Sequence, residues 1–127
     1  MALIDVDGLT GVNEASGHEA GDDVLRAVAT VLAESVRLVD TVARYGGDEF
    51  VLIAPGAAGM TVAQRVLDGV AGLAEQHGRQ ISVSVGLARF PTDGASSEEL
   101  LAAAASALEA ARVEGPGKLA TSPLKTG

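Results

Sequence analysis

The stretch VARYGGDEFVLIAP, Val42 to Pro55, places two glycines and two adjacent carboxylates between two apolar segments. The flanking segments DTVARYG and DEFVLIAP are typical of two strands joined by a Gly-Gly turn. A turn of this kind needs its small residues, but it does not need both Asp48 and Glu49. The hairpin tip is therefore a candidate functional site, and a hairpin with a merely polar tip is the alternative.

Alternation and helical spacing predict the elements around this hairpin. Residues 2–7, ALIDVD, indicate a strand, and residues 9–17 indicate a short helix. Longer amphipathic helices are expected from 18 to about 36 and from 61 to 77. The segment 80–90 alternates as a strand does, and Ser96 or Ser97 is expected to cap a last helix.

The predicted order is β-α-α-β-β-α-β-α, which favours an α+β fold. We expect a split βαβ sheet with a ferredoxin-like core, covered by helices on one or both faces. Residues 1–117 are expected to form one domain. Residues 118–127, rich in Gly, Pro and Ser, are expected to form a flexible tail.

Composition limits the partners. The net charge of −8 argues against non-specific binding to nucleic acid or to an anionic membrane. It leaves open a phosphate ligand, because a metal ion can join carboxylates to phosphates. No apolar run reaches the roughly 18 residues of a membrane-spanning helix. The chain has no cysteine, which fits a cytoplasmic location, and 2% aromatic residues, so the core should be aliphatic.

A second acidic pair, Asp5 and Asp7, stands at the end of the first predicted strand. Side chains two apart share one face of a strand, so these carboxylates repel each other unless a cation or donor lies between them. If the hairpin pairs beside this strand, Asp5 and Asp48 meet and suit Mg²⁺ with substrate phosphates. A solvated strand end is the alternative. A calcium loop is excluded because its sixth and twelfth positions hold Thr10 and Ser16.

Several motifs together resemble one family. RYGGDEF (44–50) resembles the signature of the GGDEF family, the diguanylate cyclases, and DVDGLTGVNEASGHEAGDDVL (5–25) resembles its Asp-x-Asp…Asn-x-x-x-Gly-His-x-x-Gly-Asp stretch. ISVSVGLARFP and the following SSEELL resemble its last strand and last helix. The resemblance covers roughly residues 2–117. It implies a fold similar to nucleotide cyclases and polymerase palms, and the synthesis of cyclic di-GMP from two GTP molecules.

The resemblance also implies residue roles. Metal ligands for Mg²⁺ or Mn²⁺ would be Asp5, Asp48 and the main-chain carbonyl of Val6. Glu49 would lie near the ribose 3′-hydroxyl or a second metal, and the nucleotide would lie over the glycines. These catalytic and metal residues are Asp5, Val6, Gly46, Gly47, Asp48 and Glu49.

Guanine would be read by Asn13 and Asp22, because a carboxylate accepts from the N1–H and N2–H₂ donors that adenine lacks. As an alternative, Asp22 is a favourable residue near a helix N-terminus. The RLVD segment resembles the family's product-inhibition site, with Arg37 on phosphate and guanine and Asp40 on guanine. Taken alone, an Arg-x-x-Asp motif is more often a surface ion pair.

The chain departs from the family pattern at its phosphate-binding cations. Thr10 stands at a usual lysine and Pro116 at a usual arginine, whereas Arg112 keeps one cation for phosphate. Lys118 is a possible substitute for the second. The chain also begins inside the family's first strand, so we expect its N-terminal helix to be missing.

The resemblance implies a Mg²⁺-dependent enzyme that works as a homodimer, each subunit holding one GTP, with cyclic di-GMP as product and inhibitor. It also implies an upstream sensory domain, in a cytoplasmic protein or in the cytoplasmic part of a larger sensor. The alternative is a catalytically weak module that binds cyclic di-GMP or GTP and regulates a partner.

Overall fold

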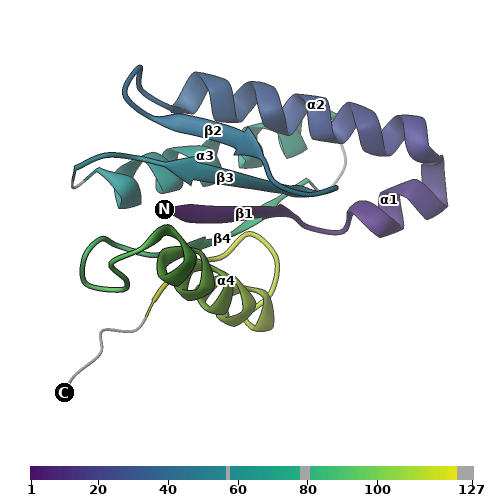
Figure 1. Ribbon diagram of the computed structural model, residues 1–127. Coiled ribbons are helices and arrows are strands. Elements are labelled where there is room, and N and C mark those ends of the chain that lie inside the picture. The colour runs from purple at the N-terminus through teal and green to yellow at the C-terminus, as the bar shows by residue number, and fades with distance from the viewer. Residues whose placement is uncertain (57, 78–80, 123–127) are drawn as a thin grey trace.

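A computed structural model describes residues 1–56, 58–77 and 81–122, without the side chains of residues 10, 11 and 77. Its elements follow the predicted order with one strand added at the end (Figure 1). They are β1 (Ala2–Val6), α1 (Leu9–Ser16), α2 (His18–Ser35), β2 (Thr41–Arg44), β3 (Glu49–Ile53), α3 (Gly59–His77), β4 (Val83–Leu87), α4 (Ser97–Val113) and β5 (Leu119–Thr121).

The sheet has the strand order β2-β3-β1-β4-β5, with β1 in the middle. Strand β1 pairs antiparallel with both β3 and β4, and the hairpin therefore lies beside the first strand as the sequence predicts. In this register Asp5 lies directly opposite Glu49 on one side and Ser84 on the other. The ladder thus places the DEF segment and the first acidic pair at the same end of the sheet.

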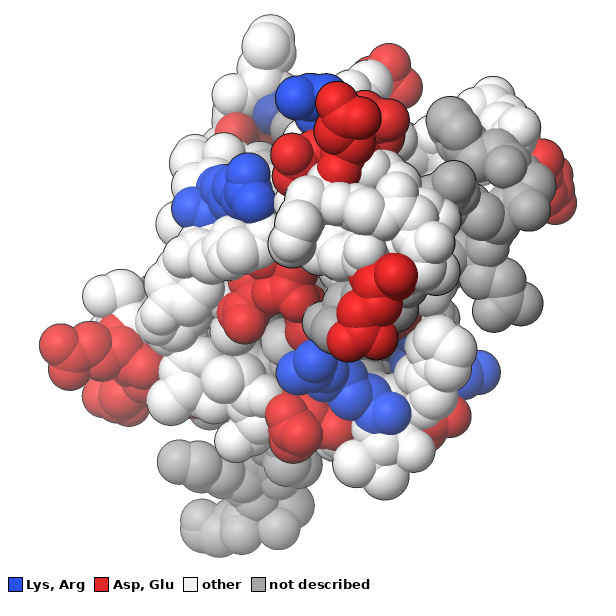
Figure 2. Space-filling model, turned by 90° about the vertical axis from the view of Figure 1, so that its right-hand side faces the viewer, with Lys and Arg blue, Asp and Glu red and all other residues white. Residues whose placement is uncertain are grey.

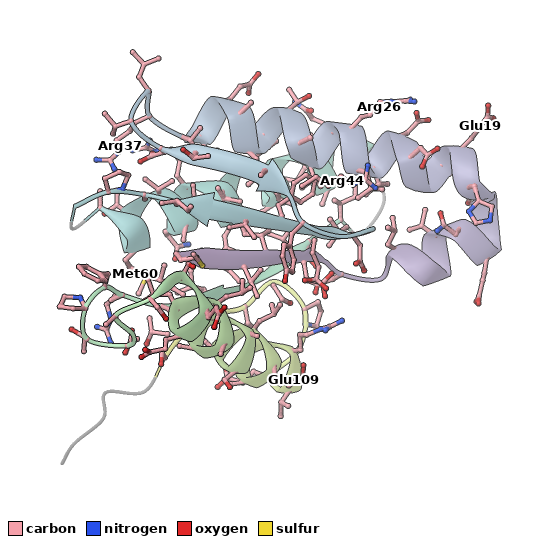
Figure 3. All side chains as sticks on the ribbon, viewed as in Figure 1. Glu19, Arg26, Arg37, Arg44, Met60 and Glu109 are labelled. Carbon is pink, nitrogen blue, oxygen red and sulfur yellow. The ribbon has the colours of Figure 1, made fainter. Side chains whose placement is uncertain are left out.

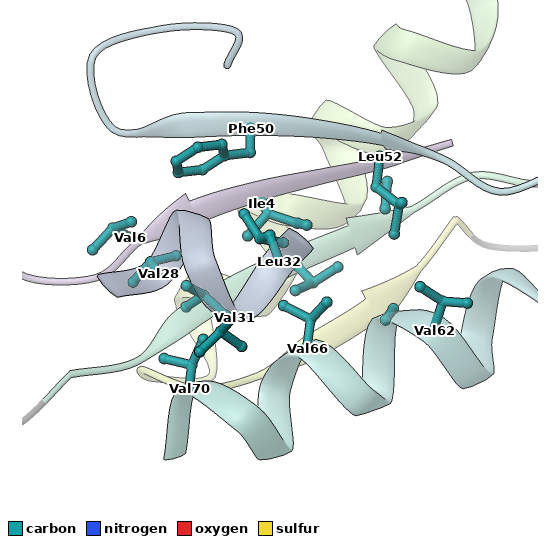
Figure 4. Close-up of a cluster of buried hydrophobic side chains, with 14 of the residues drawn as sticks. Ile4, Val6, Val28, Val31, Leu32, Phe50, Leu52, Val62, Val66 and Val70 are labelled. Carbon is teal, nitrogen blue, oxygen red and sulfur yellow. The ribbon is translucent and has the colours of Figure 1, made fainter. Parts of the chain in front are cut away.

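Helices cover both faces of the sheet. The larger core joins α2 and α3 to one face through aliphatic side chains such as Ile4, Leu32, Val66 and Val85, and Phe50 is its aromatic member (Figure 4). This composition agrees with the aliphatic core expected from the sequence. Because neighbouring strand residues alternate in direction, Leu3 and Asp5 face the opposite side, where α4 packs.

Helix α4 crosses β4 at very short range. A Cβ added to Gly86 would overlap the backbone of α4 at Ala104 and Leu108, so only glycine allows this approach. The side chain of Ser96 caps α4 by accepting a hydrogen bond from the Glu99 amide at 3.1 Å. The contact between α4 and β4 brings the C-terminal turn of α4 over the acidic end of β1.

The prediction of a flexible tail from residue 118 is wrong for its first part. Leu119–Thr121 form β5, which pairs parallel with β4. Turn-rich composition gave no hint of this strand, because its pairing depends on a neighbour more than 30 positions away. Residues 123–127 of the predicted tail lie outside the described residues.

Candidate functional site

A cavity of about 320 Å³ opens at the carboxyl end of β1. Its walls come from segments far apart in the sequence: the end of β1, the hairpin tip, β4 and the loop after α4. They include Asp7, Asp48, Ser84, Arg112 and Pro116. Figure 2 faces this end of the molecule and shows acidic side chains gathered around its recessed centre, with basic side chains beside them.

The two carboxylates predicted to bind a metal lie close together at this end of β1, one in the cavity wall and one buried beside it. Asp5 is 2% exposed, and Asp48, which is half-buried, lines the cavity above it. The Val6 amide donates to the Asp48 carbonyl at 3.0 Å, which fixes the hairpin tip against the end of β1. Burial raises the pKa of Asp5 to about 7, the charge of Asp48 adds to the rise, and the Arg112 guanidinium opposes it.

The two carboxylate oxygens of Asp5 differ in their partners. Oδ2 contacts Arg112 Nη2 at 2.8 Å, whereas Oδ1 is buried with no hydrogen-bond partner among the described residues. A buried, unpaired carboxylate oxygen beside a second carboxylate is a costly arrangement unless a cation or a donor joins them. Hard oxygen ligands of this kind fit Mg²⁺ or Mn²⁺.

The candidate metal site offers few side-chain ligands. Across residues 1–56, 58–77 and 81–122 no cluster of three or more His, Cys, Asp or Glu side chains could hold a metal ion. Two carboxylates and a main-chain carbonyl remain, which is the pattern of a Mg²⁺ site completed by substrate phosphates.

The glycines of the hairpin have no internal packing role. Gly46 and Gly47 are exposed, and an added Cβ would meet only Glu49 Cβ, at 3.8 Å from Gly46. Their carbonyls accept hydrogen bonds from Arg44, which stiffens the tip. Room beside these glycines is therefore available to a ligand rather than to another part of the chain.

Asp7 has a structural role that the sequence reasoning missed. Its carboxylate accepts hydrogen bonds from Ser82 Oγ at 2.7 Å, Ser84 Oγ at 2.6 Å and the Gly117 amide at 2.9 Å. These bonds join β1, β4 and the loop after α4, which form three walls of the cavity. The sequence carried a signal for this, since Ser82 and Ser84 occupy the same face of an otherwise apolar strand.

The two predicted guanine readers lie on neighbouring helices. The Asn13 side chain packs directly on Gly21, the residue before Asp22, where a Cβ would overlap it. Asp22 is exposed and lines a second cavity of about 280 Å³ together with Arg44 and Phe50. The structure thus brings Asn13 close to the turn of α2 that carries Asp22.

Among the positions where the family carries phosphate-binding cations, the structure places Arg112 and Pro116 at the first cavity. Arg112 lines the first cavity from the last turn of α4, but its guanidinium is engaged with Asp5. Pro116 lines the same cavity and supplies no charge, and Lys118 is not among the described lining residues. The side chain of Thr10 lies outside the described part of the structure.

Arg37 and Asp40 form a pair at the far end of the sheet. Figure 3 shows Arg37 at the opposite end of β2 from Arg44. Arg37 donates to Asp40 Oδ1 from Nη2 at 2.7 Å and to Asp40 Oδ2 from its amide at 2.8 Å, and Nη2 also reaches the Pro55 carbonyl at 3.0 Å. The hydrogen bonds from Arg37 lower the pKa of Asp40. The two predicted ligand groups therefore neutralise each other here.

Fold and site together define an α+β domain with an acidic, phosphate-compatible cavity at the end of its central strand. The family model "Diguanylate cyclase, GGDEF domain" matches residues 1–118. The chain belongs to this family.

Relatives and solved structures agree with this membership. The chain is 36% identical to the response regulator PleD of Caulobacter vibrioides over 89% of its length, and 39% identical to the diguanylate cyclase DgcZ of Escherichia coli over 73%. It spans only 27% and 34% of those two proteins.

Among solved structures, an EAL/GGDEF domain protein from M. capsulatus matches with a TM-score of 0.83 and 37% identity, covering 96% of this chain and 83% of that one. The GGDEF domain of DgcB from Caulobacter crescentus, solved in complex with c-di-GMP, matches with a TM-score of 0.81 and 30% identity, covering 95% and 75%. Within the described part of this chain, no helix has the length and apolarity needed to cross a membrane.

Proposed function

We infer that this domain is a diguanylate cyclase that condenses two GTP molecules into cyclic di-GMP and two pyrophosphates. The observation that carries this function is the closeness of Asp48, which lines the cavity, to the buried Asp5, whose Oδ1 has no hydrogen-bond partner among the described residues. Membership of the family supports the same reaction.

In this reaction the 3′-hydroxyl of each GTP attacks the α-phosphate of the other. A new phosphodiester bond forms, the bond to pyrophosphate breaks, and the hydroxyl proton leaves to a base. Glu49, opposite Asp5 in the ladder, is the carboxylate available for that proton at the hairpin. Because one subunit holds one GTP, two copies must face each other, and their alignment supplies much of the rate acceleration.

A divalent ion would be held by Asp5, Asp48 and the Val6 carbonyl. When bound, Mg²⁺ or Mn²⁺ neutralises phosphate charge and so stabilises the transition state. Asp7 keeps the cavity walls together through its hydrogen bonds to β4 and to the loop after α4. The exposed Gly46 and Gly47 leave space for the nucleotide to lie over the hairpin.

Selection of guanine is assigned to Asn13 and Asp22. The carboxylate of Asp22 would accept from guanine N1–H and N2–H₂, and adenine would leave it unpaired. Packing of Asn13 on Gly21 supports a shared site, because it holds the amide beside the helical turn that presents Asp22.

The inhibitory site is assigned to Arg37 and Asp40. Their placement at the far end of the sheet from Arg44 supports a site separate from the catalytic cavity. A ligand there has to replace the hydrogen bonds that the pair now makes with each other and with Pro55.

The decisive experiment incubates the purified protein with GTP and Mg²⁺ and detects cyclic di-GMP by mass spectrometry. Asp48→Ala should abolish product, because it removes a metal ligand at the hairpin. Asp68→Ala is the matched control, since Asp68 is an exposed carboxylate in the middle of α3 whose hydrogen-bond partner among the described residues is Gln64. Near wild-type activity in Asp48→Ala contradicts the metal assignment.

A catalytically weak binding module is the second candidate. Two observations favour it: Pro116 replaces a phosphate-binding cation, and Arg112 is engaged with Asp5. Such a module would bind cyclic di-GMP or GTP and regulate a partner. Absence of product from GTP, together with measurable cyclic di-GMP binding by calorimetry, identifies this case.

The lengths of two relatives support a proposal about the wider setting of the domain. PleD and DgcZ are three to four times as long as the matched region, which supports an upstream sensory domain in a larger protein. A homodimer and a cytoplasmic location complete this assignment. Size-exclusion chromatography with light scattering, with and without GTP, measures the dimer.

A further inference from the structure

The ion pair between Arg112 and Asp5 places a guanidinium on a buried carboxylate that is predicted to bind a metal ion. Arg112 Nη2 lies 2.8 Å from Asp5 Oδ2, and the two partners belong to the last turn of α4 and to the central strand. The side chain of Asp5 is 3% exposed and that of Arg112 is 49% exposed. The other carboxylate near Arg112 is Glu109, at 3.9 Å, so Asp5 is the dominant partner.

Arg112 compensates the buried negative charge of Asp5, as a bound metal ion would. A buried carboxylate needs a nearby positive charge, and the guanidinium provides one to Oδ2. Oδ1 has no hydrogen-bond partner in the described part of the chain, and the charge of Asp48 acts on the same carboxyl group. A divalent ion and a guanidinium on one carboxylate repel each other strongly in a site of low dielectric constant.

The guanidinium can move without any change in the fold. It is half-exposed, its stem is long, and it lines the cavity in which phosphates would lie. Phosphate is a better partner than Asp5 for the planar fork of an arginine, because it offers several charged oxygens. Transfer of Arg112 from Asp5 to phosphate would clear Asp5 for a metal ion.

We propose that Arg112 is an internal counter-ion that blocks metal binding at Asp5 until a nucleoside triphosphate draws it away. The domain then binds divalent metal weakly alone and binds metal and nucleotide together. This inference rests on the metal site of the proposed function, and it makes Arg112 a positioning residue that decides the order of binding.

The test titrates the nucleotide-free protein with Mn²⁺ at pH 8. Electron paramagnetic resonance measures the concentration of free Mn²⁺ at each step, which gives the affinity. Arg112→Gln should bind Mn²⁺ at least ~10-fold more tightly than wild type, because it removes a positive charge next to the ligand. Arg112→Lys, which keeps a cation but loses the fork, should fall between them. A GTP analogue that cannot react should tighten Mn²⁺ binding more in wild type than in Arg112→Gln.

Arg89 offers a closely matched control. It pairs with the buried Asp93 at 3.4 Å, with side-chain exposures of 46% and 1%, in a loop outside the proposed site. Arg89→Gln should leave Mn²⁺ affinity unchanged. Circular dichroism of each variant establishes that it is folded, and Arg112→Lys retains a charge beside Asp5 if the glutamine variant does not fold.

Two results would overturn the inference. One is an unchanged Mn²⁺ affinity in folded Arg112→Gln, or in folded Arg112→Lys if the glutamine variant is lost. The other is a gain that survives in the double variant Asp5→Asn with Arg112→Gln, since the ion then does not bind Asp5. A gain that needs Asp5 supports the inference even if the protein makes no cyclic di-GMP, so the two proposals fail separately.

Discussion

Replacing Asp5 by asparagine should change how the stability of the fold depends on pH. The pKa of Asp5 rises from 3.8 to about 7 in the folded protein, mainly through burial and then through the charge of Asp48. Between these values the folded state keeps a proton that the unfolded chain releases. The free energy of unfolding therefore falls as pH rises through this window.

The size of the effect follows from the pKa difference. A rise from 3.8 to about 7 corresponds, at roughly 1.4 kcal/mol per pH unit, to about 4 kcal/mol. Wild type should lose this much relative to Asp5→Asn between pH 4 and pH 8. The asparagine keeps the shape of the side chain and cannot ionise, so the difference reports the titration of Asp5 together with its interaction with Asp48.

Urea unfolding with a chelator present, followed by circular dichroism at intervals of pH, measures the difference. Circular dichroism is the suitable probe because the chain has no tryptophan and one tyrosine. Asp48→Asn removes a negative neighbour and should narrow the pH range over which the stability of the wild-type background falls. Arg112→Gln removes a positive neighbour and should extend that range to higher pH. A difference between wild type and Asp5→Asn that stays constant from pH 4 to pH 8 would refute the assignment of a raised pKa to this residue.

Three further predictions test the fold and the proposed inhibitory site at Arg37 and Asp40. Gly86→Ala should lower the free energy of unfolding by roughly 2–3 kcal/mol, because a Cβ overlaps the backbone of α4; a neutral result in urea unfolding contradicts the close crossing. Ser96→Ala should cost about 1 kcal/mol in the same assay, through loss of the cap on α4, whereas an unchanged midpoint denies the cap a role. Arg37→Ala should weaken cyclic di-GMP binding ~10-fold or more in calorimetry, as expected for a charged hydrogen-bond donor, and equal affinity dismisses the inhibitory site.

Local patterns were enough to predict most elements. The helical spacing of Val24, Val28 and Leu32 predicted α2, and alternation around Val83 and Val85 predicted β4; all five residues are buried. Such patterns work because helix and strand periodicities are properties of a short stretch of chain. Local patterns did not predict β5, because three residues after a turn carry no periodic signal and form a strand only by pairing with β4.

Motif spacing predicted the residue types of the site but not their partners. Asp5 and Asp48 were expected to meet, and the antiparallel register of β1 and β3 places Asp48, which lines the cavity, close to the buried Asp5. Arg112, which is predicted to bind phosphate, contacts Asp5, and Arg37, which is predicted to bind a ligand, pairs with Asp40. Sequence spacing does not show the partner of Arg112, because the buried charge of Asp5 is stabilised by an opposite charge from a segment far along the chain.

By itself the amino-acid sequence determined the succession of helices and strands as far as α4, the aliphatic core and the family, since these depend on neighbours along the chain. The tertiary structure alone decided that Asp7 joins β4 to the loop after α4, and that Arg112 reaches Asp5. These contacts depend on how α4 packs across the sheet. Packing of that kind is set by desolvation and close approach between distant segments, which no local pattern encodes.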